Sequence, residues 1–93
     1  MQSMNVEDIF SSRLRMKILR MLVQIGELNV SQIARRLNIN YTTTSKHLKV
    51  LEDERILTHK EFGRVRLYRF EEHSPKAKAV QALIETWEHQ TSK

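Results

Sequence analysis

The sequence predicts a mainly α-helical domain that carries a small β-hairpin. Apolar residues recur at the helical spacing of three and four positions in the segments 13–25, 30–54 and 75–90. At about 57–70 the spacing changes to two extended runs that flank a glycine. With 93 residues, two glycines and one proline, the chain is expected to form one domain, 1–93, with only short loops.

The charge balance favours a polyanionic partner. Sixteen lysines and arginines oppose eleven aspartates and glutamates, which gives a formal net charge of +5 and a pI of about 9.9. The sequence has no cysteine, which excludes disulfides, thiolate metal sites and cysteine nucleophiles. No apolar run reaches the length of a membrane span, and the first residues lack the features of a signal peptide, so a cytoplasmic protein without membrane contact is expected.

Two helices are predicted at the start of the chain. Val6–Phe10 is expected to form a short helix, and Arg13–Ile25 a longer one that ends at Gly26. The apolar residues of the longer helix repeat at helical spacing and are Leu14, Ile18, Leu19 and Leu22. This spacing predicts a central core helix.

The segment 30–54 has the pattern of a helix-turn-helix. A first helix opens at Val30, with Asn29 or Ser31 as its cap, and a tight connection at 38–40 leads into a second. In such a motif the first helix braces the second across the DNA backbone. Arg35 and Arg36 of the first helix are expected to project outward.

The second helix of this motif is predicted to read DNA. Asn40 is placed to cap it. One face is expected to pack inward and consists of Thr44, Leu48 and Leu51. The opposite face carries hydroxyls and ammonium groups, which suit base edges and phosphates, and consists of Thr42, Lys46 and Lys49. An ordinary amphipathic helix with a solvated polar face is the alternative.

The segment 57–70 is predicted to be a β-hairpin. Leu57–Glu61 and Val65–Phe70 are the extended runs, and the three residues 62–64 join them, with Gly63 able to take a positive φ. Tyr68 and Phe70 share one face and are expected to pack inward. The basic residues of this hairpin are Lys60, Arg64, Arg66 and Arg69.

The last predicted helix, at about 75–90, has Ser74 as its cap and Pro75 in its first turn. Its apolar stripe consists of Val80, Leu83, Ile84 and Trp87. So large a stripe must be covered either by the body of the domain or by a partner subunit.

Four stretches in order resemble the ArsR-type winged helix-turn-helix transcriptional regulators: Arg15–Leu22, Val30–Ile39, Thr43–Leu51 and Gly63–Phe70. The third follows that family's S-x-H-L-x-x-L recognition-helix pattern. The resemblance implies a dimeric DNA-binding regulator in which the first and last helices of two subunits pack together. The chain departs from the family at Glu54 or Arg55, where a glycine is common, and in lacking the cysteines of the metal-sensing members. MarR-like regulators share much of the same pattern.

These observations together predict a homodimer bound to a near-palindromic double-stranded operator, with no cofactor, no metal and no catalytic site. The residues expected to contact DNA are Ser31, Gln32, Tyr41, Thr42, Thr43, Ser45, Lys46, Lys49, Lys60, Arg64 and Arg66. The residues expected at the dimer interface are Met4, Val6, Ile9, Phe10, Val80, Leu83, Ile84 and Trp87.

Two alternatives are open. A winged helix can serve as a protein–protein interaction or dimerisation module without specific DNA binding; the basic residues of the hairpin and of the helix-turn-helix favour DNA instead. Glu85 and His89 are four positions apart and could share a zinc ion across a dimer, although a solvated ion pair is the simpler account. His47, beside the inward face of the recognition helix, is expected to be a packed, hydrogen-bonded residue rather than a ligand.

Overall fold

The computed structural model of the chain describes residues 4–91 and confirms the predicted fold class. The helices within these residues are α1 (Val6–Phe10), α2 (Arg13–Ile25), α3 (Val30–Leu37), α4 (Tyr41–Asp53) and α5 (Pro75–Thr91). The strands are β1 (Leu28–Asn29), β2 (Leu57–Phe62) and β3 (Val65–Phe70). The ends of the expected domain, 1–3 and 92–93, lie outside the described residues.

Helix α2 runs through the middle of the molecule. The Ser12 hydroxyl caps it by accepting from the Arg15 backbone N–H at 3.2 Å, and Gly26 ends it at a φ of +100°. Ile18, Leu19 and Leu22 are buried, which confirms the predicted core helix. They pack with apolar side chains of the other elements: Ile9, Leu28, Val30, Ile33, Leu48, Leu51, Ile56, Leu57, Tyr68, Phe70, Ala77, Val80 and Ile84.

Three asparagines begin or end the two helices of the helix-turn-helix. Asn29 and Gln32 cap the start of α3 reciprocally, each accepting a backbone N–H of the other at 2.8 Å. Asn38 ends α3 in the left-handed conformation, with a φ of +59°, which asparagine tolerates better than most residues. Asn40 then caps α4 by accepting from the Thr43 N–H at 2.7 Å, as predicted.

The wing is the hairpin of β2 and β3. Leu57 pairs with Phe70 and Phe62 with Val65, so β2 is one residue longer than predicted and the connection is two residues, Gly63 and Arg64. Gly63 has a φ of +61°. Strand β1 pairs antiparallel with β3, so the order in the sheet of the described residues is β1-β3-β2. This pairing ties the start of α3 to the wing.

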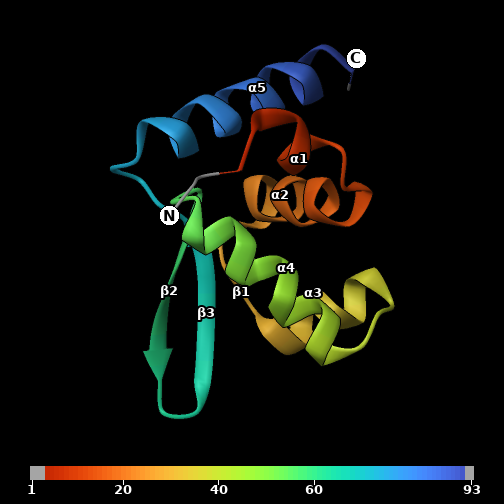
Figure 1. Ribbon diagram of the computed structural model, residues 1–93, viewed down its shortest axis with the longest axis vertical. Helices are drawn as coiled ribbons and strands as arrows, with labels where there is room; N and C mark the ends of the chain where they lie inside the picture. The colour runs from red at the N-terminus through yellow and green to blue at the C-terminus, as the bar shows by residue number, and fades with distance from the viewer. Residues whose placement is uncertain (1–3, 92–93) are drawn as a thin grey trace.

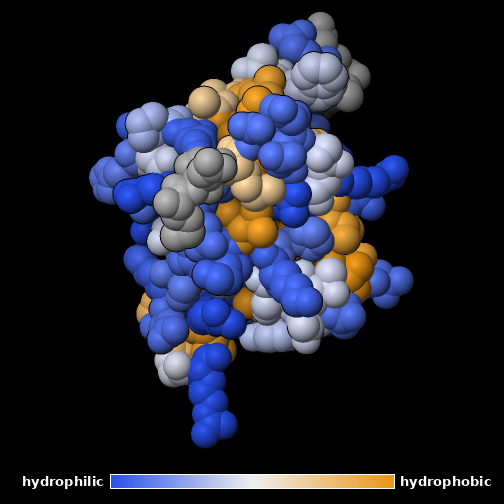
Figure 2. Space-filling model, viewed as in Figure 1, coloured by the Kyte–Doolittle hydropathy of each residue, from blue (hydrophilic) through white to orange (hydrophobic). Residues whose placement is uncertain are grey.

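The elements separate into two ends of the molecule (Figure 1). The tip of the wing and the start of α4 lie at the lower end, whereas α1 and α5 lie at the upper end, with α2 between. Figure 2 shows hydrophobic side chains reaching the surface where α1 and α5 lie, whereas the end of the wing shows both hydrophilic and hydrophobic side chains. The exposed hydrophobic residues there are Phe62 and Val65. None of the helices in the described part of the chain is long and apolar enough to cross a membrane.

The exit from α4 has an unusual backbone conformation. Arg55 has a φ of +63°, in the left-handed region where a non-glycine residue costs about 1–2 kcal/mol. This is one of the two positions at which the resembling family commonly has glycine. The Arg55 N–H donates to the Glu52 carbonyl at 2.9 Å, and the chain then turns directly into the buried residues Ile56 and Leu57.

Candidate nucleic-acid interface

The first two turns of α4 present hydroxyl groups and a lysine to solvent. Tyr41, with 51% of its surface exposed, is joined there by the exposed Thr42 and Lys46 and by the half-buried Thr43. Thr44 is fully buried and its hydroxyl donates to the Asn40 carbonyl at 2.9 Å. The predicted division of α4 into an inner and an outer face is therefore confirmed, since Leu48 and Leu51 are also fully buried.

The acidic end of α4 neutralises part of this face. Lys49 Nζ lies 3.3 Å from Asp53 Oδ1, four positions further on, and both side chains are exposed. Exposed pairs of this kind contribute little, about 0.3–0.5 kcal/mol, so a phosphate can compete with the carboxylate for the lysine. Lys46, one turn earlier, lies nearer the start of the helix, where the helix dipole also favours an anion.

The wing is joined to α4 through a side-chain contact. The interaction of the Arg66 guanidinium with the Tyr41 hydroxyl, and then with Tyr68, raises the pKa of Arg66 above its ordinary value. Arg66 therefore stays charged. Its position between the wing and the start of α4 places a fixed cation at the junction of the two elements.

A shallow hollow of about 90 Å³ lies at this junction. Residues from the start of α3, the start of α4 and the tip of the wing line it, namely Asn29, Val30, Ser31, Tyr41, Arg64, Val65 and Arg66. Ser31 and Arg64 are exposed beside it. Three segments far apart in the sequence thus present donors and cations around one concave surface, which suits a polyanionic backbone.

Gln32 and Ser45 are placed less favourably for contact with DNA than the other expected residues. The Gln32 side chain is half-buried and is occupied by the cap of α3. The Ser45 hydroxyl oxygen is covered and has no hydrogen-bond partner among the described residues. The other expected residues, Lys60 of β2 among them, are exposed or half-buried.

The sequence matches the model of the bacterial regulatory protein arsR family over residues 12–59, more than half of the chain. The chain belongs to the ArsR family. The match spans α2, the helix-turn-helix and the first residues of the wing. As a member of this family, the winged-helix protein is a DNA-binding transcriptional regulator.

Solved structures of other regulators share the fold. HlyU from Vibrio cholerae in its reduced form is 23% identical with a TM-score of 0.76, and the alignment covers 92% of this chain and 84% of that one. The repressor BigR from Xylella fastidiosa is 26% identical with a TM-score of 0.74, covering 92% and 83%. The homodimeric winged helix-turn-helix DNA-binding domain Mb0332 from Mycobacterium bovis is 25% identical with a TM-score of 0.73, covering 95% and 79%. No curated protein sequence matches the chain.

No group of three or more histidine, aspartate or glutamate side chains is arranged to hold a metal ion within residues 4–91. Glu85 and His89, the pair considered for zinc, are both exposed on α5 of this ArsR-family chain.

A polar contact that sequence spacing did not reveal braces the recognition helix from behind. Arg15 Nη1, from α2, donates to Nδ1 of His47 at 3.2 Å, while its Nη2 donates to the Asp8 carbonyl of α1 at 2.7 Å. His47 is therefore a packed, hydrogen-bonded residue in this ArsR-family protein, as expected. Burial and the neighbouring guanidinium together lower the pKa of His47 below its ordinary 6.5.

The lowered pKa of His47 predicts a loss of stability in mild acid. Because the folded protein holds His47 neutral more strongly than the unfolded chain does, unfolding takes up a proton as the pH falls below about 6.5. The free energy of unfolding of the wild type should therefore decrease between about pH 7 and pH 5. His47→Gln cannot gain this charge and should show a smaller decrease in urea unfolding over the same range. Equal decreases in the free energy of unfolding of both proteins would contradict the attribution of the acid sensitivity to His47.

Proposed function

We propose that this ArsR-family chain acts in the cytoplasm as a homodimer that binds a near-palindromic double-stranded operator. Helix α4 enters the major groove, and the wing follows the flanking backbone. The observation that carries this proposal is the hollow at which the exposed start of α4, the start of α3 and the cationic tip of the wing meet around one concave surface. A phosphate backbone fits such a surface, since donors and cations reach it from three segments.

The exposed side chains divide into two proposed roles. Thr42 and Thr43, at the start of α4, are small enough to approach base edges in the major groove. Phosphates are bound by the cations and by donors at the start of each helix, namely Ser31, Tyr41, Lys46, Lys49, Lys60, Arg64 and Arg66. Gln32 and Ser45 are not retained as direct contacts, because the first caps α3 and the hydroxyl of the second is covered.

The dimer is proposed to form through α1 and α5. Trp87 has 69% of its surface exposed, and Val6, Phe10 and Leu83 are exposed as well, whereas Met4 is half-buried. Three other residues of the expected interface are covered within the subunit itself: Ile9, Val80 and Ile84. The homodimeric Mb0332 domain, which shares the fold, supports a dimeric assembly.

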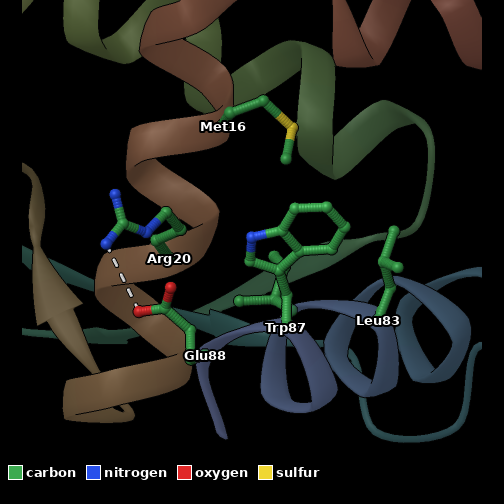
Figure 3. A pocket seen from close by; sticks show the side chains of 6 residues that line it. Met16, Arg20, Leu83, Trp87 and Glu88 are labelled. Atoms are coloured by element: carbon green, nitrogen blue, oxygen red, sulfur yellow. Dashed lines mark hydrogen bonds and ion pairs between the residues drawn. The ribbon is translucent and has the colours of Figure 1, made fainter. Parts of the chain in front are cut away.

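The proposed anchor for a second subunit is the hollow around Trp87 (Figure 3). The indole ring of Trp87 stands beside α2, between Met16 and Leu83. The surrounding hollow has a volume of about 470 Å³ and is rimmed by an ion pair of 3.3 Å between Arg20 and Glu88. An aromatic side chain within such a hollow, ringed by polar groups, has the features of an interface anchor. On a twofold axis this patch would meet its own copy, so both subunits would cover it at once.

Substitutions that separate base contacts from phosphate contacts test the proposal. Thr43→Ala should weaken binding to a selected operator by about 1–3 kcal/mol and change random DNA little, because it removes a contact to a base edge. Lys46→Ala should weaken binding to both DNAs by about the same factor, because it removes a phosphate contact. Arg64→Ala should weaken both DNAs alike, because it removes only a phosphate contact.

The matched control for this experiment is Lys78→Ala, which removes one exposed cation from α5, away from the wing and α4. It should bind both DNAs almost as the wild type does. Fluorescence anisotropy with operator and random duplexes measures these affinities. Equal losses on operator and random DNA for the three test variants, or a loss for the control as large as theirs, would refute the proposed division of roles.

A further inference from the structure

A buried carboxylate joins the end of the recognition helix to the segment before α1 and to the first turn of α5. Glu54 follows α4 directly, and only 7% of its surface is exposed. Its Oε1 accepts a hydrogen bond from Lys76 Nζ, in the first turn of α5, at 2.8 Å. Its Oε2 accepts from the backbone N–H of Met4, just before α1, at 2.9 Å. One side chain therefore holds three segments that lie far apart in the sequence.

The charge on this carboxylate is maintained by the same contacts. The hydrogen bond from Lys76, and then that from Met4, lower the pKa of Glu54, although burial opposes them. Glu54 is therefore ionised at neutral pH and holds its two donors with charge-assisted bonds, which are stronger than neutral ones. A buried charge that loses its partner is strongly unfavourable, so the three groups stay together.

Apolar packing at this position is incomplete. A hollow of about 100 Å³ lies next to Glu54 and Lys76, lined otherwise by Met4, Val6, Ile9, Phe10, Ile56 and Val80. Helix α4 packs chiefly against α3, α2 and β2 rather than against α1 or α5. The Glu54 carboxylate is therefore a direct polar link between the recognition helix and the two helices proposed to form the dimer. Arg15, which contacts both His47 and α1, braces the middle of α4, so Glu54 supplies the second fixed point.

We propose that Glu54 is a positioning residue that fixes the angle of α4 relative to the dimer helices, and so limits the half-site spacing that the dimer accepts. This inference rests on the proposed function, because it requires a dimer that reads two half-sites. The Arg15 contact at the middle of α4 and the Glu54 contacts at its end together restrain the direction of the helix axis. Helix α4 is held in its own unit by packing against α2, α3 and β2, and the Glu54 bonds restrain that unit relative to α1 and α5. Without these bonds the unit can shift relative to the dimer helices, and each recognition helix can then reach half-sites at more than one separation.

The test compares spacing tolerance with affinity for a single half-site. An operator is first selected from random double-stranded DNA with the full-length wild type. Duplexes are then made with one half-site, with both at the selected spacing, and with the spacing changed by one or two base pairs. Lys76→Met removes the cation and keeps the aliphatic stem, whereas Lys76→Arg keeps the cation and is the matched control. Glu54→Gln removes the negative charge.

Lys76→Met and Glu54→Gln should remain dimers in sedimentation and should bind the single half-site as the wild type does. On the selected operator they should bind roughly tenfold more weakly, within the range typical of a coupling between sites. Their preference for the selected spacing over the altered ones should also fall. Lys76→Arg should retain the wild-type preference. A role confined to stability would instead weaken every duplex by the same factor, the single half-site included.

The inference is overturned if Lys76→Met keeps the wild-type spacing preference, or if it weakens half-site and full operator by the same factor. Lys76 is about half exposed, so this variant decides the matter even where Glu54→Gln fails to fold. A wild type that binds no DNA, or that is a monomer, overturns the proposed function and this inference with it. A wild type that binds with no spacing preference overturns the inference alone.

Discussion

Raising the salt concentration from about 50 to about 200 mM should weaken operator binding by about 10³–10⁵-fold, if each dimer neutralises roughly 6–10 phosphates. The physical reason is the release of counterions from DNA when cations of the protein replace them. Each chain has a formal net charge of +5, and its exposed cations include Lys46 and Lys60, with Arg64 at the wing tip. Titrations at four or five salt concentrations give the slope of log affinity against log salt.

Substitutions show how much each residue contributes to the slope of log affinity against log salt. Arg64→Ala and Lys60→Ala should each reduce it by about two, because each removes one phosphate contact from each of the two subunits and a contact contributes about 0.9 to the slope. Lys78→Ala, on α5, should leave it unchanged and serves as the control. A binding constant that does not respond to salt, or no binding to genomic fragments at low salt, would exclude the proposed interface.

Trp87→Ala should lower the affinity of the two subunits for each other by about 2 kcal/mol or more, because buried aromatic anchors dominate interface energetics. Operator binding should weaken as a result, although no residue that faces DNA is changed. Sedimentation at micromolar protein concentration measures the first effect, and anisotropy with the selected operator measures the second.

Phe62→Ala provides the control for this experiment. Phe62 is an aromatic residue with 59% of its surface exposed, but it lies at the end of β2 in the wing, away from α1 and α5. Its removal should leave the dimer intact. If the wild type sediments as a monomer, or if Trp87→Ala remains fully dimeric and binds DNA normally, the interface proposed at α5 is wrong.

The sequence predicted the elements of this fold well, because their signals are local. The caps at Asn40 and Ser74, and the glycine that ends α2, each act on the backbone within one helical turn. The pairing of β1 with β3 was not predicted. It joins residues about forty positions apart, and a two-residue strand is too short to show an alternating pattern.

The helical period identified the apolar stripe on α5. It did not show which residues of that stripe are buried within the subunit and which are exposed. Val80 and Ile84 are four positions apart along one line of the helix and are buried in the core. Leu83 and Trp87 lie along the neighbouring line and are exposed. A helical wheel places both lines on one apolar face, whereas the position of α2 decides where the core ends.

In the candidate site, too, the sequence predicted the features that follow from local pattern but not those that depend on packing. The outward face of α4 follows from a period of 3.6, and the cationic wing follows from composition. By contrast, the Gln32 cap and the covered hydroxyl of Ser45 depend on side-chain conformation and packing. The bonds of Arg15 to His47 and of Glu54 to Lys76 join residues 32 and 22 positions apart, and no local pattern of the sequence encodes them.

The short strand β1 has a consequence for how the protein folds. Because β1 and the start of α3 are continuous, the pairing of β1 with β3, some forty residues later in the chain, fixes the helix-turn-helix against the wing. Leu28 and Tyr68, which face each other in that pairing, are both core residues. The DNA-reading motif therefore shares its core with the wing, and a chain that ends at residue 54 lacks part of that core.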